Sequence, residues 1–264
     1  MRSSHRLKIG CMQHPFDAER AACAERAERA ERAERAERAE RAERETDFGA
    51  QVLLVFARVP AFGLVKTRIA KTLGNVRALR IYRVLGRVVM MQLRRALKNN
   101  VSVRIVHTPD DGDNDMRAWL GPDFDTVPQG DGDLGTRMWR AVAREFRAGS
   151  ERLVVVGTDC PELSAVIVEQ AFNALNTHDV VFGPATDGGY YLIGVHQRAK
   201  NVALSTLFSG VPWSSSQTLS VSRSRASDAG LSVFELEMLS DIDSASDWRA
   251  WLERNAVRPA MWRT

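Results

Sequence analysis

Two acidic residues follow two apolar runs in the middle of the sequence. Asp159 comes directly after Val154–Thr158, and Asp187 comes directly after Val180–Thr186. Short apolar runs rich in β-branched residues indicate strands that are buried on both faces of a mostly parallel sheet. Open α/β sheets bind ligands outside the carboxyl ends of their strands. The pattern therefore predicts two carboxylates at one edge of a sheet, which suits a metal–phosphate site.

The residues around Asp159 allow two interpretations. An aspartate between a strand and Pro161 can cap a βα turn, or it can bind a metal ion. Carboxylate oxygen suits Mg²⁺ or Mn²⁺ that is held jointly with substrate phosphates. The neighbouring Cys160 has no evident histidine partner, so we expect a small buried thiol rather than a nucleophile.

Asp187 begins the sequence Asp-Gly-Gly-Tyr-Tyr, which ends at Tyr191. The glycines Gly188 and Gly189 permit either close approach of a ligand or a positive φ. Asp187 could orient an acceptor hydroxyl or act as a base. The alternative is a glycine-rich hairpin turn with an exposed aspartate.

A loop with basic residues follows the first apolar run. Gly63 would let the backbone approach a phosphate, and the start of the next helix favours anions. Lys66 adds a point charge, and Arg68 adds a bidentate fork. With a single glycine, the loop is neither a P-loop nor a dinucleotide-binding fingerprint. An ordinary βα turn with solvated cations remains the alternative.

Two more segments contain polar residues at helix starts. Residues 129–137 form a glycine-rich turn in which Asp133 could cap the following helix. Near the end of the chain, Ser244 is a plausible N-cap and Asp247 lies at N3, as in a capping box with Asp in place of Glu. This structural role is compatible with a metal role for Asp243, but spacing alone does not show that Asp243 meets Asp159.

The elements expected to position these residues are strands and helices that alternate along the chain. We expect strands at 51–57, 101–107, 124–127, 153–157, 180–182, 190–195 and 231–235. We expect helices from about residue 66 and at 75–98, 116–120, 134–147, 165–175, 202–208, 214–229 and 245–255. Such alternation predicts right-handed βαβ units and a central, mostly parallel sheet.

The first 50 residues differ from the remainder. Ala-Glu-Arg repeats without interruption over residues 24–44 and places Glu25 four residues before Arg29. Such pairs support a helix, but the repeat has no large apolar stripe to bury. We expect a solvated, fraying helix or a disordered charged extension at 1–50 and a single domain at 51–264.

Composition limits the function further. The chain has 264 residues, of which 44% are hydrophobic, and a net charge of +4. That charge is small for the length, so nucleic-acid binding is not implied, and the arginines of residues 80–94 fit a solvated helix face. Three cysteines without a disulfide or zinc spacing, no bilayer-spanning run and no signal sequence predict a cytoplasmic protein. The oligomeric state stays open.

Six of these segments, taken in order, resemble a known family. They are residues 56–68, 129–138, 157–163, 183–194, 207–213 and 241–248. The family is the DUF2064-type group of bacterial proteins with a glycosyltransferase-A fold. Some members are named arsenosugar-biosynthesis glycosyltransferases, and 2-phospho-lactate guanylyltransferases are distant relatives. The resemblance covers nearly all of residues 51–264, and it departs from the usual pattern at Arg58, Phe62 and Ser214.

The resemblance implies a three-layer α/β/α sandwich of the nucleotide-diphospho-sugar transferase type, and it implies roles for individual residues. Asp159 and Asp243 would bind Mg²⁺ or Mn²⁺. The donor nucleotide would contact Arg58, Gly63, Lys66, Arg68, Gln129 and Gly135. The acceptor would contact Asp187, Gly188, Gly189, Tyr190 and Trp213. Lys66 and Asp187 would take part in catalysis.

The function expected from this resemblance is a metal-dependent transferase that uses a nucleotide-activated donor. A nucleotide sugar and a small-molecule acceptor are the preferred substrates. Nucleotidyl transfer from a nucleoside triphosphate would use the same residues and is the first alternative. The second is a nucleotide-binding protein without catalysis, against which the presence of Asp159, Asp187 and Asp243 argues.

Overall fold

The computed structural model describes residues 29, 32, 51–94, 101–201 and 204–255 of the chain. The chain separates into two units, residues 1–48 and 49–264. Only Arg29 and Arg32 of the first unit are described, and both are helical. Most of the expected charged extension therefore lies outside the described residues, and the predicted division at residue 50 stays a prediction. The following description concerns the second unit.

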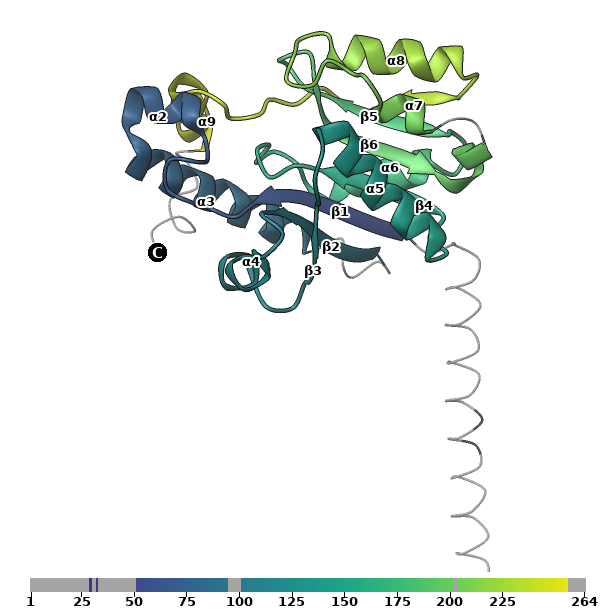
Figure 1. Cartoon of the computed structure of the whole chain (residues 1–264), viewed down its shortest axis with the longest axis horizontal. Helices are drawn as coiled ribbons and strands as arrows, with labels where there is room; N and C mark the ends of the chain where they lie inside the picture. Colours follow the sequence, from purple (N-terminus) through teal and green to yellow (C-terminus); the bar gives the residue numbers. More distant parts are fainter. Residues whose placement is uncertain (1–28, 30–31, 33–50, 95–100, 202–203, 256–264) are drawn as a thin grey trace, which may run out of the picture. The chain divides into compact units, whose positions relative to one another are not determined.

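The centre of this unit is a seven-stranded sheet with the order β3-β2-β1-β4-β6-β5-β7 (Figure 1). The strands are β1 (Gln51–Arg58), β2 (Val101–Thr108), β3 (Asp125–Pro128), β4 (Arg152–Val156), β5 (Val180–Pro184), β6 (Tyr190–His196) and β7 (Val233–Glu235). Among these strands only β6 is antiparallel to its neighbours, β4 and β5. The prediction of a mostly parallel α/β sheet is confirmed.

Helices connect the strands. They are α2 (Thr67–Leu73), α3 (Asn75–Leu93), α4 (Asp113–Leu120), α5 (Leu134–Arg147), α6 (Ala165–Ala174), α7 (Ser205–Phe208), α8 (Thr218–Asp228) and α9 (Ala245–Asn255), with a 3₁₀ turn, η2 (Gln197–Asn201). The bounds of α5 and α9 match the sequence prediction. Helix α8 starts later than predicted, because Ser214 has a φ of 61° and the Thr218 hydroxyl donates to the carbonyl of Pro212.

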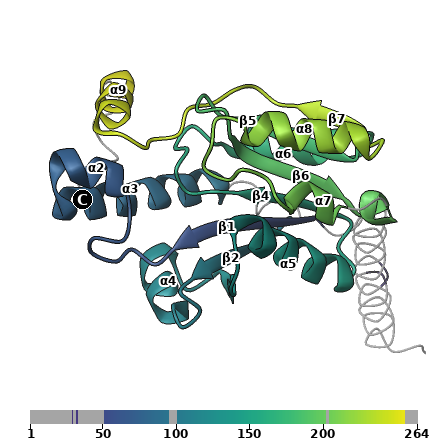
Figure 2. The same cartoon turned by 45° about the horizontal axis from the view of Figure 1, so that its top comes forward.

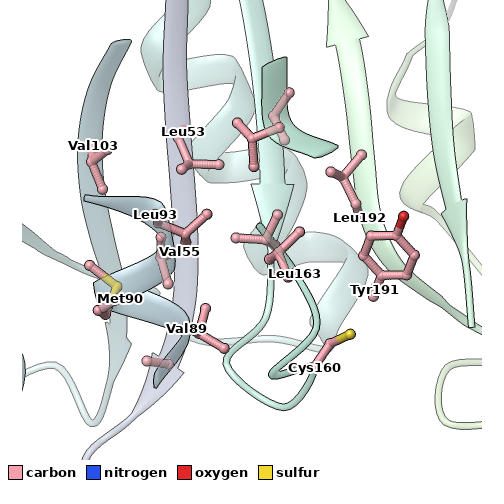
Figure 3. Packing of buried hydrophobic residues seen from close by; sticks show 14 of the residues in the cluster. Leu53, Val55, Val89, Met90, Leu93, Val103, Cys160, Leu163, Tyr191 and Leu192 are labelled. Carbon is pink, nitrogen blue, oxygen red and sulfur yellow. The ribbon is translucent and has the colours of Figure 1, made fainter. Parts of the chain in front are cut away.

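Side chains alternate between the two faces of the sheet and fill a separate core on each. On β1, Leu53 and Val55 face a core that contains residues of α3, α4 and α6, whereas Val52 and Leu54 face residues of α5, α7 and α8 (Figure 2). Figure 3 shows side chains of the first core, with Val89 of α3 among them. Burial of each such side chain contributes roughly 1.5–3 kcal/mol, so both helical layers are held firmly to the sheet.

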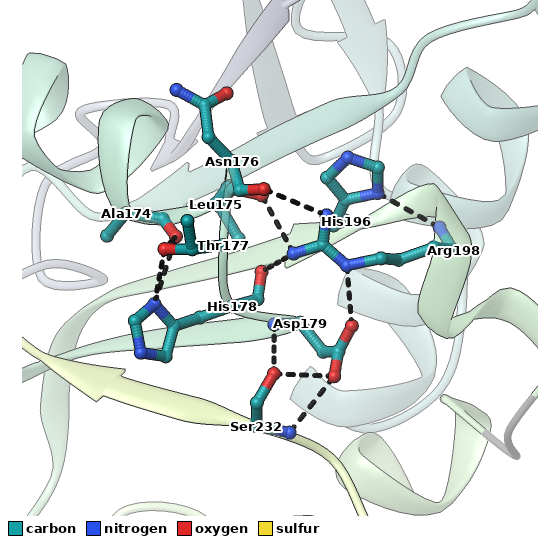
Figure 4. Close-up of polar contacts among 9 residues, drawn as sticks. All are labelled: Ala174, Leu175, Asn176, Thr177, His178, Asp179, His196, Arg198 and Ser232. Atoms are coloured by element: carbon teal, nitrogen blue, oxygen red, sulfur yellow. Dashed lines mark hydrogen bonds and ion pairs between the residues drawn. The ribbon is translucent and has the colours of Figure 1, made fainter.

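Hydrogen bonds of Arg198 and Asp179 connect the end of α6 with the starts of β5 and β7 (Figure 4). The Arg198 guanidinium donates to the carbonyls of Leu175 and His178 and to Oδ1 of Asp179, the last at 2.8 Å. The other carboxylate oxygen of Asp179 accepts from the backbone and hydroxyl of Ser232. This network fixes the start of β5 beside the segment that enters β7.

No described helix is both long and apolar enough to cross a bilayer.

Candidate active site

A cavity of about 670 Å³ lies at the carboxyl ends of β1 and β4. After β1 the chain continues to β2 on one side of β1, and after β3 it crosses to β4 on the other side, so the strand order reverses at this point. Such a switch point opens a crevice in which open α/β sheets bind ligands. The cavity lining includes Arg58, Lys66, Asp159, Asp187 and Asp243. They come from four separate segments of the chain, since Arg58 and Lys66 both belong to the connection from β1 to α2.

The ammonium of Lys66 joins the two predicted metal ligands. Its Nζ lies 3.0 Å from Oδ1 of Asp159 and 2.9 Å from Oδ1 of Asp243. Nη1 of Arg68 lies 3.4 Å from the other carboxylate oxygen of Asp243. Because both aspartates contact one nitrogen atom, their carboxylates are close enough to share a single cation. Sequence spacing alone could not establish this proximity.

Lys66 is held in place by its backbone and by burial. It is the residue before α2 and has a left-handed conformation with φ 46°, which costs free energy for a residue with a Cβ. Its side chain is only 5% exposed. Burial, the largest single effect, lowers the pKa of Lys66, but the carboxylates of Asp159 and Asp243 together raise the pKa above its usual value. The group is therefore a charged ammonium at neutral pH.

Asp243 reaches the cavity on residues 236–244, which we call the strap. Figures 1 and 2 show the strap between β7 and α9, with α9 beside α2. Backbone bonds attach it to the sheet, since Leu239 N donates to Pro184 O and Ile242 N donates to Asp159 O, both at 3.0 Å. The side chain of Ile242 is buried with residues of α2, α3 and α9. The strap therefore carries Asp243 to the end of β4.

The expected capping box fixes the end of the strap. The backbone N–H of Asp247 donates to the Ser244 hydroxyl at 3.2 Å, and Oδ2 of Asp247 accepts from the Ser244 N–H at 2.7 Å. The same oxygen accepts from the backbone N–H of Asp243 at 3.1 Å. The capping prediction is confirmed, and the box also orients the residue that contacts Lys66.

Asp241 is a cavity residue that sequence reasoning did not select. Burial and the nearby charges of Asp243 and Asp187 raise its pKa to about 6. In an extended segment, residues two apart lie on the same side, so the spacing of Asp241 and Asp243 was the available signal. Arg137, Tyr82 and Thr158 also line the cavity without having been assigned a role.

The turn between β5 and β6 carries Asp187, and it is a hairpin as the alternative interpretation expected. Oδ1 of Asp187 accepts from the backbone N–H of Gly189 at 2.8 Å. Gly188 has a φ of 87°, and a Cβ there would lie 2.7 Å from the Cα of Ser216. Asp187 and Gly189 line the cavity, whereas Gly188 packs against the chain's own backbone.

Two aromatic residues line the cavity near this turn. The rings of Tyr190 and Trp213 meet edge to face with centroids 6.3 Å apart. Burial raises the pKa of Tyr190, so its phenol is neutral at physiological pH. The indole Nε1 of Trp213 is buried and has no hydrogen-bond partner among the described residues. A Cβ on Gly135 would lie 1.9 Å from the carbonyl oxygen of Phe208 and 2.8 Å from the Trp213 ring, so this glycine makes room for both.

The remaining residues that were predicted to contact the donor nucleotide do not all line the cavity. Arg58 lines the cavity, and its backbone N–H and carbonyl both bond to the hydroxyl of Tyr82. Gln129 also lines it, but its side-chain amide is buried and donates to the carbonyls of Ala57 and Val106. Gln129 therefore braces β1 against β2. Gly63 and Gly135 are absent from the cavity lining described here.

Cys160 is 3% exposed and belongs to the core beside α3 and α6 (Figure 3). Burial raises the pKa of its thiol to about 12. The thiolate is the reactive form of cysteine, so this pKa leaves almost none at neutral pH. The expectation of a buried, unreactive thiol is confirmed.

Comparison with known proteins identifies the family of this fold. Residues 92–215 match the family model described as "Uncharacterized protein conserved in bacteria (DUF2064)". A proposed nucleotide-diphospho-sugar transferase from Desulfovibrio desulfuricans G20 is 31% identical, with a TM-score of 0.72, and the match covers 81% of this chain and 90% of that protein. The chain belongs to the DUF2064 family. Its α/β/α sandwich is that of the nucleotide-diphospho-sugar transferases.

More distant solved structures share the fold of this DUF2064 protein. A nucleotidyl transferase from Methanothermobacter thermautotrophicus is 14% identical with a TM-score of 0.53, and the match covers 80% of this chain and all of that one. The 4-diphosphocytidyl-2C-methyl-D-erythritol synthase of Anaerococcus prevotii is 12% identical with a TM-score of 0.51, covering 78% and 100%. At these identities the likeness concerns the fold alone. No protein with a curated description matches the sequence.

The chemistry of the cluster in this DUF2064 protein fits a divalent cation in part. Among the described residues no three His, Cys, Asp or Glu side chains form a ready metal site. Mg²⁺, however, is usually bound by one or two carboxylates together with substrate phosphates and water. Asp159 and Asp243 supply two carboxylates, and the buried Oδ1 of Asp159 has no well-aligned hydrogen bond among the described residues. These two carboxylates therefore fit a metal ion that also binds phosphate oxygens of the substrate.

Proposed function

We propose that this DUF2064 protein is a transferase that uses a nucleotide-activated donor, with a nucleotide sugar as the donor and a small-molecule alcohol as the acceptor. The observation that carries the proposal is the contact of Lys66 with Asp159 and Asp243 at the carboxyl ends of β1 and β4. The 31% identity to the Desulfovibrio protein, itself a proposed nucleotide-diphospho-sugar transferase, supports the same chemistry.

Lys66 and Arg68 would bind the donor diphosphate. Both cations line the cavity, and Arg68 is 69% exposed, so its guanidinium is free to turn towards a ligand. In the reaction they would stabilise the negative charge that grows on the leaving diphosphate. Arg58 and Arg137 line the same cavity and would add to its affinity for anions.

Asp159 and Asp243 would hold Mg²⁺ or Mn²⁺, which when bound neutralises charge on the leaving diphosphate as a Lewis acid. Asp187 would accept a hydrogen bond from the acceptor hydroxyl and so orient it for attack. Its own bond to the N–H of Gly189 holds the carboxylate at the tip of the β5–β6 turn. Tyr190 and Trp213 would contact the body of the acceptor.

A thermal-shift screen tests the donor proposal. Nucleoside diphosphates, nucleoside triphosphates and nucleotide sugars are each added with and without Mn²⁺. A ligand that binds the native state raises its apparent melting temperature by mass action. Lys66→Ala and Arg68→Ala should weaken nucleotide binding roughly tenfold to a hundredfold, as expected from the loss of a charge-assisted hydrogen bond.

Lys71→Ala is the matched control, because Lys71 is an exposed lysine of α2 that does not line the cavity. With the best nucleotide identified, the released product separates the two transfer reactions. A nucleoside diphosphate indicates glycosyl transfer, and inorganic diphosphate indicates nucleotidyl transfer. If no nucleotide stabilises the folded protein with or without Mn²⁺, the proposed function is wrong.

A further inference from the structure

A lysine ammonium occupies the position where two carboxylates would hold a metal ion. The oxygens that face each other across the cluster are Oδ1 of Asp159 and Oδ1 of Asp243, and both are within 3.0 Å of the Lys66 nitrogen. The side chain of Lys66 is 5% exposed, whereas Lys71 of α2 is an exposed residue. The cluster is therefore already neutralised in part by the chain itself.

We propose that Lys66 is a specificity-determining residue that makes the site select a metal–diphosphate complex over the free metal ion. The inference rests on the proposed function, because it assigns the ligand of the same site. Its ammonium serves as the counter-ion of Asp159 and Asp243 until a diphosphate takes it over. The free metal ion, which brings no anion for Lys66, would bind weakly.

The Lys66 ammonium and a metal ion compete for the same place between the two Oδ1 atoms. A divalent ion binds carboxylate oxygen at roughly 2.0–2.6 Å, so an ion shared by the two Oδ1 atoms would lie next to the present Nζ position. Two cations that close together repel each other strongly in a partly buried site. Lys66 must therefore move before both carboxylates can act as metal ligands.

The surroundings explain why Lys66 moves only when another anion is present. Its side chain is 5% exposed, so little water is available to solvate an ammonium that loses its two carboxylates. An unpaired charge in such a place is costly. A diphosphate supplies oxygen atoms for the ammonium and further oxygen ligands for the metal. Binding of metal and of diphosphate should therefore be coupled, and such coupling is reciprocal.

The backbone of Lys66 is consistent with this role. A left-handed conformation is uncommon for a residue with a side chain, and here it precedes α2 directly. Arg68, two residues later, contacts the outer oxygen of Asp243 at 3.4 Å and is well exposed. Arg68 can therefore remain with Asp243, or reach the same diphosphate, while Lys66 changes partners.

Binding of Mn²⁺ alone tests the inference without an enzyme assay. Free Mn²⁺ has a strong electron paramagnetic resonance signal that decreases when the ion binds, so a titration gives the affinity directly. We expect weak binding to the native protein and at least tenfold tighter binding to Lys66→Met, which keeps the stem and removes the charge. Lys71→Met is the control and should behave as the native protein does.

Two further variants keep the result interpretable. Lys66→Met/Asp159→Asn should lose the gained Mn²⁺ affinity, and if it keeps that affinity the ion is bound elsewhere and the inference is wrong. Lys66→Gln replaces Lys66→Met if the latter does not fold. Equal Mn²⁺ affinity of native protein and Lys66→Met would also overturn the inference, because the ammonium would then not compete.

Inorganic diphosphate is the probe for coupling. In the native protein, Mn²⁺ and diphosphate together should raise the melting temperature by more than the sum of their separate effects. In Lys66→Met this excess should be smaller, because only the direct bonds between the metal and the diphosphate oxygens then couple the two ligands. An equal excess in both proteins would contradict the inference. If Lys66→Met gains Mn²⁺ affinity but no nucleotide stabilises the native protein, the proposed function fails while the competition between lysine and metal stands.

Discussion

Replacement of Gly188 by alanine is a direct test of how the turn that carries Asp187 is built. Gly188 has a φ of 87°, and an added Cβ would lie 2.7 Å from Cα and 2.8 Å from the carbonyl carbon of Ser216. These are backbone atoms of a neighbouring segment and cannot rotate away. The Gly188 carbonyl also accepts from the N–H of Leu219 at 3.0 Å, so the two segments are bonded at the point of the clash.

Two costs add in this variant. A residue with a Cβ in a left-handed conformation loses roughly 1–2 kcal/mol. Overpacking against a rigid neighbour costs roughly 1–3 kcal/mol more. We therefore expect Gly188→Ala to lower the free energy of unfolding by about 2–5 kcal/mol. For a unit of this size, 1 kcal/mol corresponds to about 2–4 °C, so the melting temperature should fall by roughly 4–20 °C.

Gly189→Ala is the matched control in the same turn. Its φ lies outside the left-handed region, and the nearest atom to an added Cβ is Oδ1 of Asp187 at 3.1 Å, which is on a side chain that can move. We expect a change within about 1 kcal/mol. Differential scanning fluorimetry and urea unfolding measure both variants. If Gly188→Ala is as stable as Gly189→Ala, with equal m-values, then the backbone of Ser216 does not restrict residue 188 to glycine.

Two other predictions concern the capping box and the N-terminal segment. Asp247→Ala removes the acceptor for two backbone N–H groups and should cost about 1 kcal/mol at pH 7. Burial, the largest single effect, raises the pKa of Asp247, but its hydrogen bonds with Ser244 and Asp243 lower the net pKa below 3.8. The contribution of the Asp247 carboxylate to the free energy of unfolding is therefore present above pH 3.8 and is lost as the pH falls through its lower pKa in the folded state. If urea unfolding shows that Asp247→Ala loses the same free energy of unfolding at pH 2.5 as at pH 7, this linkage is wrong. Deletion of residues 1–45 should leave the melting temperature nearly unchanged, and a loss of several degrees would show that the repeat packs on the fold.

Sequence alone determined the alternation of strands and helices, because each element depends on neighbours in the chain. The β-branched runs that end before Asp159 and Asp187 are strands, as expected. Helix α5 begins where Asp133 caps it, with the Thr136 N–H donating to its carboxylate at 2.8 Å. Helix α9 begins at the capping box of Ser244. Capping and hydrophobic periodicity act over a few residues, and a single sequence displays them directly.

Tertiary structure decided which of the candidate residues meet. Lys66 and Asp243 are 177 positions apart, and they come together only because the strap is bonded to the ends of β4 and β5. The glycine at 188 is required by the backbone of Ser216, and the amide of Gln129 is used between β1 and β2. These contacts depend on strand order and on the path of distant segments. Local propensity contains no information about either, so only the folded chain places a lysine between the two aspartates.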